Sequence, residues 1–381
     1  MLRSCVAFAW LNLVRGDRVR LAVAIGGAMV AIYIVIVHLA FLRAVEHKAA
    51  QLYSLFDAEV AMISDRYQFV YRMGDFPAAR LRQALSVGGV DAASAVRVSA
   101  SRWVSLPNGA QSSLLLIGIE PDPAFLKDPE LRANAPALRT PRTALLDRLA
   151  DPELGRHQSG DAARIGDRNV TVAGSYALGL PMYAAATAIV ANGDFPYYTG
   201  EPADRVQLGL LRLAPGADVG ESVAALRAAL PQDVRVMSRE ALMAREAHYF
   251  VEVKPLGIMM RTGLVIGLIV GAIALYQVMS SQVESRLGDF AVLRAMGFGA
   301  FYTHAVGAAQ LAMIGGAAFA AAWLGAIPLF AVVSDRSHLF LPLDGELFGT
   351  ALALCVPMIA SAAAPLVRAA RAEPARLFAA A

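Results

Sequence analysis

Lysine and recognisable catalytic motifs are scarce in this chain of 381 residues. Its only lysines are Lys48, Lys127 and Lys254, and none of them follows a glycine, which excludes a phosphate-binding loop of the form GxxxxGK[ST]. No HExxH zinc motif and no GxSxG nucleophile elbow occurs, and the six histidines are scattered singly. The sequence therefore predicts a chain that is not an enzyme and binds no cofactor or metal of its own. Any energy it uses must come from another subunit.

Cysteine is almost absent as well, since Cys5 and Cys355 are the only two. Both fall at or near apolar segments, so the large hydrophilic region between them has no disulfide, even in an oxidising compartment. Neither thiol has a neighbouring ligand pattern, which favours packing as the role of both.

Charged residues make up 17% of the chain, against about a quarter in soluble domains. Hydrophobic residues make up 57%, and the mean hydropathy is +0.51. These values predict a membrane protein whose surroundings are a lipid bilayer. The formal net charge of +3 is too small, at this length, to favour nucleic acid as a partner.

Four apolar runs are long enough to be predicted as transmembrane helices across a hydrocarbon core of about 30 Å. The first, at 21–45, follows a basic amphipathic segment at 1–20, which we expect to lie in the headgroup layer with Trp10 as an anchor. A cleavable signal peptide is the alternative, but the run is too long and lacks a small-residue cleavage site. The other three runs lie at about 256–279, 305–333 and 347–367.

The arginines set the expected orientation. They recur in 1–20, in the loop at 280–300 and in the tail at 368–381, whereas the short turn between the last two runs holds one. The positive-inside rule therefore predicts that both termini lie on the cytoplasmic side of a bacterial inner membrane.

The region 46–253 differs from the rest in its charges, prolines and alternating apolar runs. It is predicted to be a large mixed α+β domain, inserted between the first and second helices and lying outside the cytoplasm, in the periplasm. The expected strands are Ala58–Ser64, Ala95–Leu106, Ser113–Glu120, Asn169–Ser175, Val206–Leu213 and Val234–Met237. The expected helices are Phe76–Ser86, Val219–Leu230 and one that begins at the N-cap Ser238 and runs towards a restart at Pro255.

Few polar side chains interrupt the apolar runs, and the candidates are His38, Arg261 and Gln310. We expect a structural role for His38 and snorkelling to the headgroups for Arg261. Three polar residues are few for the lining of a hydrophilic pore. In the third run, small residues permit close helix packing, either in a dimer or within one subunit's own bundle: Gly307, Gly315, Gly316 and Gly325.

The segment Val283–Phe298 is short, charged and helix-favouring, and it lies between two apolar runs. Val283, Leu287 and Phe290 recur at helical spacing, and Gly297 is a natural helix stop. A solvated connector would explain the pattern, but its cytoplasmic position also suits the docking of an energy-supplying subunit. The candidate coupling residues are Glu284, Arg286, Asp289, Phe290, Leu293, Arg294, Met296 and Gly297.

The order of these parts resembles that of the FtsX/MacB-like, type VII (mechanotransmission) ABC transporter permeases. The stretch from Arg286 to Gly297 is similar to that family's segment between its second and third helices, and Ala372–Phe378 is similar to its short ending. A narrower resemblance, to the DevC branch, rests on segments such as Leu116–Pro121 and Leu145–Arg148. Asp289 stands where the family usually has glutamate.

The resemblance implies a homodimer of permeases, each docked on a separate ABC ATPase that binds ATP and magnesium. For the DevC branch it also implies a membrane-fusion-type periplasmic adaptor, a TolC-like outer-membrane channel and efflux of a hydrophobic or lipid-like substrate. Other branches, similar to FtsX and LolC, extract lipoproteins, sense peptides or activate cell-wall hydrolases. A membrane-anchored sensor without an ATPase is a further alternative.

Overall fold

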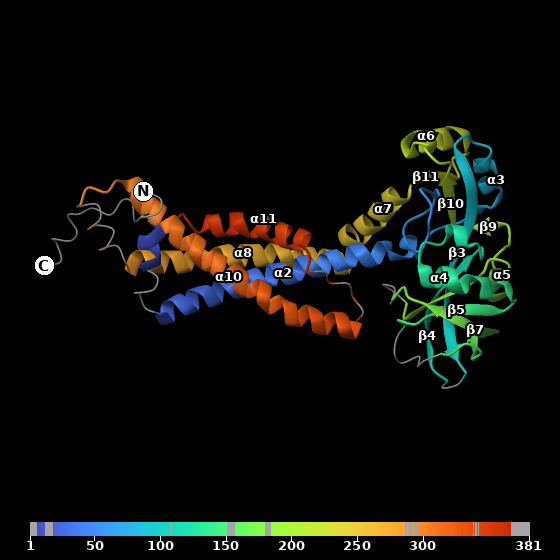
Figure 1. The fold of residues 1–381 in the computed structure, drawn as a ribbon, viewed down its shortest axis with the longest axis horizontal. Coiled ribbons are helices and arrows are strands. Elements are labelled where there is room, and N and C mark those ends of the chain that lie inside the picture. The colour runs from blue at the N-terminus through green and yellow to red at the C-terminus, as the bar shows by residue number, and fades with distance from the viewer. Residues whose placement is uncertain are drawn as a thin grey trace. The chain divides into compact units, whose positions relative to one another are not determined.

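The structure is a computed structural model of the whole chain. The residues it describes are 6–11, 18–106, 109–150, 157–179, 184–285, 288, 292, 296–337, 339, 341 and 343–366. The chain forms two compact units (Figure 1), a helical unit of 1–44, 255–337 and 341–381 and a sheet unit of 45–254 and 338–340. Helix α2, Arg18–Ser54, contributes residues to both, so it runs nine residues beyond the predicted end of the first apolar helix.

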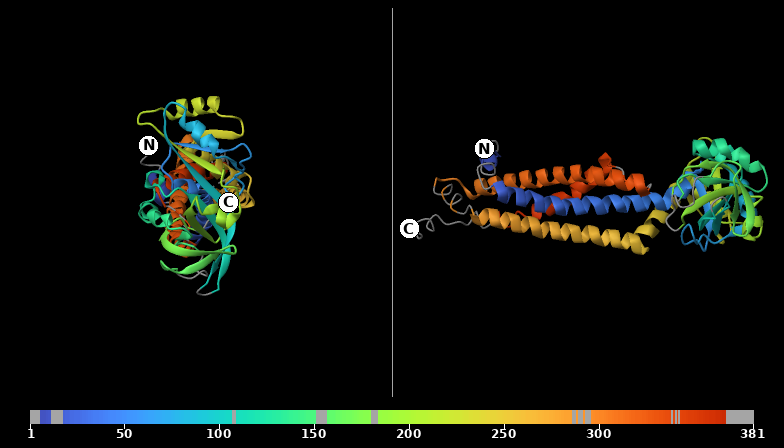
Figure 2. Two further views of the ribbon diagram at one scale, coloured as in Figure 1. Left: turned by 90° about the vertical axis from the view of Figure 1, so that its right-hand side faces the viewer. Right: turned by 90° about the horizontal axis from the view of Figure 1, so that it is seen from below.

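In the helical unit, α2 lies alongside α8 (Pro255–Ser285), α10 (Ala300–Ser337) and α11 (Gly345–Ser361) (Figures 1 and 2). Among the described residues, three helices are long and apolar enough to cross a membrane. They are Leu21–Ser54, Pro255–Glu284 and His304–Asp335.

The predicted fourth span at 347–367 is not confirmed at that length. Helix α11 has 17 residues and ends at Ser361, whose hydroxyl donates back to the carbonyl of Met358 at 2.6 Å. Pro365 explains this end, because a proline ring clashes with the carbonyl four residues before it, here that of Ser361. Pro357, by contrast, lies inside the helix.

Glycines bring the helices of this unit close together. On α8, a Cβ added at Gly263 would lie 2.2 Å from Nε2 of His38, and one at Gly267 would lie 3.1 Å from Ile34, both on α2. On α10, a Cβ at Gly307 or Gly315 would lie 2.2 Å from Leu366 or 2.8 Å from Ile359. Two of the four glycines predicted to permit packing therefore serve this chain's own bundle, whereas Gly316 faces open space.

An ion-pair cluster joins α2 to the start of α11. Arg43 donates to Asp344 at 2.9 Å and to Glu346 at 2.6 Å. Asp344 also caps α11, since its carboxylate accepts from the backbone N–H of Leu347 at 2.7 Å. That hydrogen bond, followed by the charge and hydrogen bond of Arg43, lowers the pKa of Asp344.

The sheet unit is a mixed α/β domain. The described strands are β1 (Val60–Ser64), β2 (Phe76–Pro77), β3 (Val90–Ser105), β4 (Gln111–Ile119), β5 (Thr143–Asp147), β6 (Ala162–Ile165), β7 (Arg168–Tyr176), β8 (Ala186–Ala191), β9 (Arg205–Val206), β10 (Leu208–Leu213) and β11 (Val234–Ser238). The helices are α3 (Ala79–Leu85), α4 (Pro129–Asn134), α5 (Phe195–Thr199), α6 (Val219–Ala229) and α7 (Arg239–Glu252), with 3-10 turns at Pro123–Phe125 and Ala135–Arg139.

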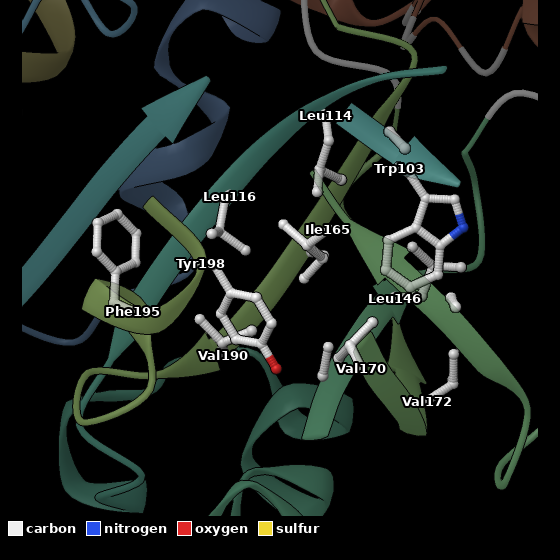
Figure 3. Packing of buried hydrophobic residues seen from close by; sticks show 14 residues of the cluster. Trp103, Leu114, Leu116, Leu146, Ile165, Val170, Val172, Val190, Phe195 and Tyr198 are labelled. Atoms are coloured by element: carbon white, nitrogen blue, oxygen red, sulfur yellow. The ribbon is translucent and has the colours of Figure 1, made fainter. Parts of the chain in front are cut away.

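Nine of these strands form one sheet in the order β11-β1-β10-β3-β4-β8-β5-β7-β6. The long strand β3 pairs with β10 at its start, with β4 along most of its length and with β6 at its end. Six strands, from β3 through β4, β8, β5 and β7 to β6, therefore close into a ring. Their apolar side chains point toward one another around Trp103 (Figure 3), and Phe195 and Tyr198 from α5 join them.

The other end of the sheet stays open and is covered by helices. Val60, Met62 and Val236 from the strands pack against Leu81 of α3 and Leu226 of α6 in a second core. Burial of this kind is the main stabilising term in a domain with water on its outside.

The expected helix Phe76–Ser86 begins later than predicted. Phe76 and Pro77 pair with β9 instead, and α3 starts at Ala79. A residue before proline avoids the helical region, which explains the extended start. Strands β5, β6 and β8 were not predicted at all.

Candidate functional site: the junction between helices α2 and α7

Most of the predicted coupling segment lies outside the described residues, which leaves Arg286, Asp289, Phe290, Leu293 and Arg294 as predictions. Glu284 is exposed near the end of α8. Met296 is 68% exposed, and its N–H donates to the carbonyl of Val292 at 3.0 Å, as in a helical turn. Gly297 follows with φ +91°, the left-handed geometry expected of a helix stop.

The three polar candidates of the apolar runs have different surroundings. His38 is half-buried, and its Nδ1 donates to the carbonyl of Ile34 at 2.9 Å within the same helix. Gln310 is buried in α10, and Arg261 is exposed on α8. The placement of His38 against Gly263 is a packing contact between two helices.

A polar network that the sequence analysis missed lies in the sheet unit, where the last turns of α2 meet α7. We call it the helix junction and define it by Tyr53, Tyr67, Val70 and Glu246. Helix α7 begins where the hydroxyl of Ser238 accepts from the N–H of Ala241 at 3.1 Å, which confirms the predicted N-cap. Leu242, Glu246 and Phe250 then recur every four residues on its buried face.

Glu246 is the centre of the helix junction and is 0% exposed. Its carboxylate accepts from the N–H of Val70 at 2.7 Å and from the hydroxyl of Tyr67. The hydroxyls of Tyr67 and Tyr53 lie 2.6 Å apart. Because Tyr67 gives its one proton to Glu246, Tyr53 is the donor of that last bond. One chain of hydrogen bonds thus connects α2 to α7 through the loop that follows β1.

The electrostatics of the junction follow from its burial. Burial raises the pKa of Glu246 to about 7, although the hydrogen bonds from Tyr67 and Val70 and the charge of Arg245 act against that shift. Burial also raises the pKa of the Tyr67 hydroxyl, with the nearby Tyr53 and Glu246 adding to the effect. The carboxyl group of Glu246 therefore releases its proton near neutral pH.

Aromatic rings cover the junction. Phe69 stacks on Tyr249 with ring centroids 5.0 Å apart and meets Phe250 edge-on at 5.9 Å. The Nζ atom of Lys254 lies 4.1 Å from the centroid of Phe69. The contacts extend to the last residues before α8, which begins at Pro255, the predicted restart.

A second set of contacts holds α2 on the ring of strands. Gln51 donates to the carbonyl of Leu178, and a Cβ at Gly179 would lie 2.9 Å from Nζ of Lys48. The loop that holds Leu178 and Gly179 is fixed in turn by Asp147, which accepts from both of their N–H groups, at 3.1 and 2.7 Å. Burial raises the pKa of Asp147, against the effect of its hydrogen bonds from Leu149, Leu178, Gly179 and Thr187.

A small cavity of about 30 Å³ separates the two sets of contacts. It is lined by Lys48, Gln51 and Leu52 of α2 and, among others, by Val70, Leu178 and Phe250. That volume suits about one water molecule. The end of α2 is therefore held by hydrogen bonds as well as by the burial of Ala49, Leu52 and Tyr53.

The helix junction is enclosed by the protein around it. Its buried carboxylate faces two phenols and a backbone N–H instead of a nucleophile in an open cleft. No group of three His, Cys, Asp or Glu residues that could hold a metal ion occurs in the described part of the chain. The arrangement joins the end of α2 to α7 through hydrogen bonds.

Comparisons with known proteins give solved structures only, since no family model and no curated protein matches the chain. The periplasmic region of MacB from Actinobacillus actinomycetemcomitans is 10% identical, with a TM-score of 0.38, over 50% of this chain and 92% of that one. The extracellular domain of YknZ, a noncanonic ABC-type transporter from Gram-positive bacteria, is 12% identical, with a TM-score of 0.34, over 48% of this chain and 100% of that one.

A domain of a putative permease protein from Porphyromonas gingivalis is 14% identical, with a TM-score of 0.30, over 49% of this chain and 87% of that one. The three structures are domains of MacB, of YknZ and of a permease protein, which is the kind of protein that the resemblance predicts, and none of them is described as a member of the DevC branch. TM-scores this low carry no conclusion about activity or partners, which must come from the chain's own residues.

Proposed function

We propose that this chain is the permease subunit of an ABC exporter and transmits ATP-driven motion to its sheet unit. The observation that carries the proposal is the helix junction. Helix α2 includes an apolar stretch long enough to cross a membrane and ends in a buried hydrogen-bond chain with α7. Helix α7 leads in sequence, after two residues, into α8, a second helix of that kind. In sequence, the apolar stretches of α2 and α8 are thus both continuous with segments that reach the helix junction.

In this proposal a separate cytoplasmic ATPase docks on the segment that contains Glu284 and Met296, and ATP and magnesium bind to that ATPase alone. A push on this segment moves α8 and α2, and the helix junction turns the relative movement of the two helices into a change in the sheet unit. The hydrogen bonds of Glu246 fix the angle between the helix ends, because a carboxylate shared by a phenol and a backbone N–H has strict geometry.

The finer assignments follow from the resemblance. The permease acts as a homodimer in a bacterial inner membrane, with both termini in the cytoplasm and the sheet unit in the periplasm. A membrane-fusion-type adaptor and a TolC-like channel complete a tripartite exporter of a hydrophobic or lipid-like substrate.

The test of the junction is Tyr53→Phe, with Thr143→Val as the control. Tyr53→Phe removes a buried hydroxyl from a hydrogen bond at 2.6 Å to Tyr67, and Thr143→Val removes one from a hydrogen bond at 2.7 Å to the carbonyl of Thr140, so each should cost about 1 kcal/mol of stability. Only Tyr53→Phe is expected to lower export while leaving ATP hydrolysis intact. Equal export in both variants would remove the junction from the mechanism.

The test of the docking segment uses Arg294→Glu and Phe290→Ala in the full chain. Both variants are expected to insert into the membrane and to lose the coupling between ATP hydrolysis and export. Full export in both would contradict the docking assignment. Copurification of a lipoprotein chaperone or a cell-wall hydrolase, in place of an adaptor and a channel, would favour the alternative permease functions.

A further inference from the structure

An exposed pair of arginines shares one tyrosine on the ring of strands, away from the residues of the helix junction. The guanidinium carbons of Arg142 and Arg168 each lie 5.0 Å from the ring centroid of Tyr197. The two charges are therefore no farther apart than the sum of those distances. Neither arginine has an ion-pair partner among the described residues. We call these three residues the arginine patch.

The backbone of Arg142 is strained, because its turn needs a positive φ that an arginine rarely adopts. Its φ is +62°, and it is the one non-glycine residue with positive φ in the described part of the chain. It follows Pro141, in a turn where the second central position usually takes glycine or asparagine. Such an outlier costs of order 1 kcal/mol and persists where a side chain is needed for function.

Both backbone groups of Arg142 are fixed. Its N–H donates to Asp194 at 2.6 Å, and its carbonyl accepts from the N–H of Thr171 at 3.0 Å. Arg168 begins β7 and pairs with Ile165 across the β6–β7 hairpin. These hydrogen bonds hold the backbone from which the guanidinium of Arg142 reaches the tyrosine that Arg168 also reaches.

Tyr197 gives the patch a rigid base. Its half-buried ring packs against the core of the strand ring and meets Tyr198 edge-on at 5.1 Å. Arginines held over a fixed aromatic ring lose little side-chain freedom on binding, and a guanidinium accepts a carboxylate through two parallel hydrogen bonds. The patch is therefore preorganised for anionic groups.

We infer that the arginine patch binds an acidic polypeptide segment of a partner protein. Tyrosine and arginine are enriched among the residues that dominate protein interfaces. An anionic membrane surface fits less well, because it attracts clusters of four to eight basic residues. Here two arginines share the ring of Tyr197, fewer than such a cluster has. This inference does not depend on the proposed coupling to an ATPase.

The test measures binding of a fluorescent hexaglutamate peptide to the full chain in nanodiscs of uncharged lipid, at about 50 mM salt, where surface charges are weakly screened. The double variant Arg142→Gln/Arg168→Gln is expected to lower the affinity about tenfold or more. The matched control is Arg82→Gln/Arg235→Gln, which removes two exposed arginines from α3 and β11 and should change the affinity less than about twofold.

A second variant separates binding from folding. Arg142→Gly relieves the left-handed backbone, so its melting temperature should equal or exceed that of the wild type, while its affinity for hexaglutamate falls. Three results would each overturn the inference: no binding by the wild type, equal weakening in the control, or unchanged affinity in Arg142→Gly. Binding of phosphatidylglycerol vesicles that requires the patch, without binding of the peptide, would reassign it to lipid and also overturn it.

Discussion

The helices of the two units are held by different kinds of contact. In the helical unit, contacts between helices are made where side chains are missing, as at Gly263 against His38 and Gly307 against Leu366. In the sheet unit, the contacts that fix α2 and α7 are made by hydroxyl and carboxyl groups such as those of Tyr53 and Glu246. The difference indicates two solvents, because lipid offers helices no hydrophobic reason to associate whereas water does.

The largest expected effect tests the aromatic core of the sheet unit. Trp103 is fully buried inside the ring of strands. Trp103→Ala should lower the stability of the sheet unit by about 3–5 kcal/mol, since it removes a large apolar side chain and leaves a cavity. Thermal unfolding of the full chain in detergent, followed by near-UV circular dichroism, measures the loss. A drop below about 1 kcal/mol would show that this core collapses around the gap.

The next effect tests the buried proton of Glu246. Its folded pKa of about 7 lies above its ordinary value of 4.5, so the folded state binds more protons between these pH values. Stability should therefore fall as the pH rises through this window, by up to about 3 kcal/mol, and then stay level above it. Melting temperatures at pH 5 and pH 8 measure the difference.

Glu246→Gln is the control for that pH dependence. The amide keeps the shape but does not titrate, so most of the slope should vanish. A smaller fall in stability with rising pH should remain because of Asp147, since burial also raises the pKa of that carboxyl group. An unchanged slope would show that Glu246 is not the group responsible.

A third effect tests the glycine contacts of the helical unit. Gly263→Leu places a side chain where a Cβ alone would lie 2.2 Å from Nε2 of His38, so the helices must separate. Overpacking of this kind costs about 1–3 kcal/mol. Gly316→Leu, with nothing within 4 Å, should be neutral or should stabilise its helix. Similar melting temperatures in detergent for both variants would contradict this account of the packing.

The smallest effect tests whether charge matters to the helical unit. Arg43→Gln removes the pairs with Asp344 and Glu346, both of which are partly exposed. The melting temperature should fall less than in Trp103→Ala or Gly263→Leu, and the difference should shrink as salt is added. A loss that is large and independent of salt would show that this cluster is buried by a neighbour.

The sequence predicted best where one periodicity held over many residues. Strands β4 and β7 and helix α6 were placed within two residues at each end, because alternation or helical spacing is visible along them, whereas β3 begins five residues before its predicted start. Strands β5 and β8 were missed because both faces are buried, so Thr143–Asp147 and Ala186–Ala191 show no alternation. Strand β6 has only four residues.

The helix junction could not be found from sequence spacing, since 179 positions separate Tyr67 from Glu246. One signal was available. Glu246 occupies the same face of α7 as Leu242 and Phe250, and an acid within an apolar stripe needs a buried partner. Which residue supplies that partner depends on the sheet, which no local pattern encodes.

The position of β1 has a consequence for the order in which the chain is made. This strand, the first of the domain, lies between β10 and β11, which are the last two strands of the sheet. During synthesis both of its edges stay unpaired until about 150 further residues have followed, and pairings this distant in sequence form slowly. Until then, the unpaired edges of Val60–Ser64 can form backbone hydrogen bonds with a strand of another chain. We expect the nascent domain to depend on a holding chaperone over that interval, which ends only after β8, the last strand of the ring in sequence, has been made.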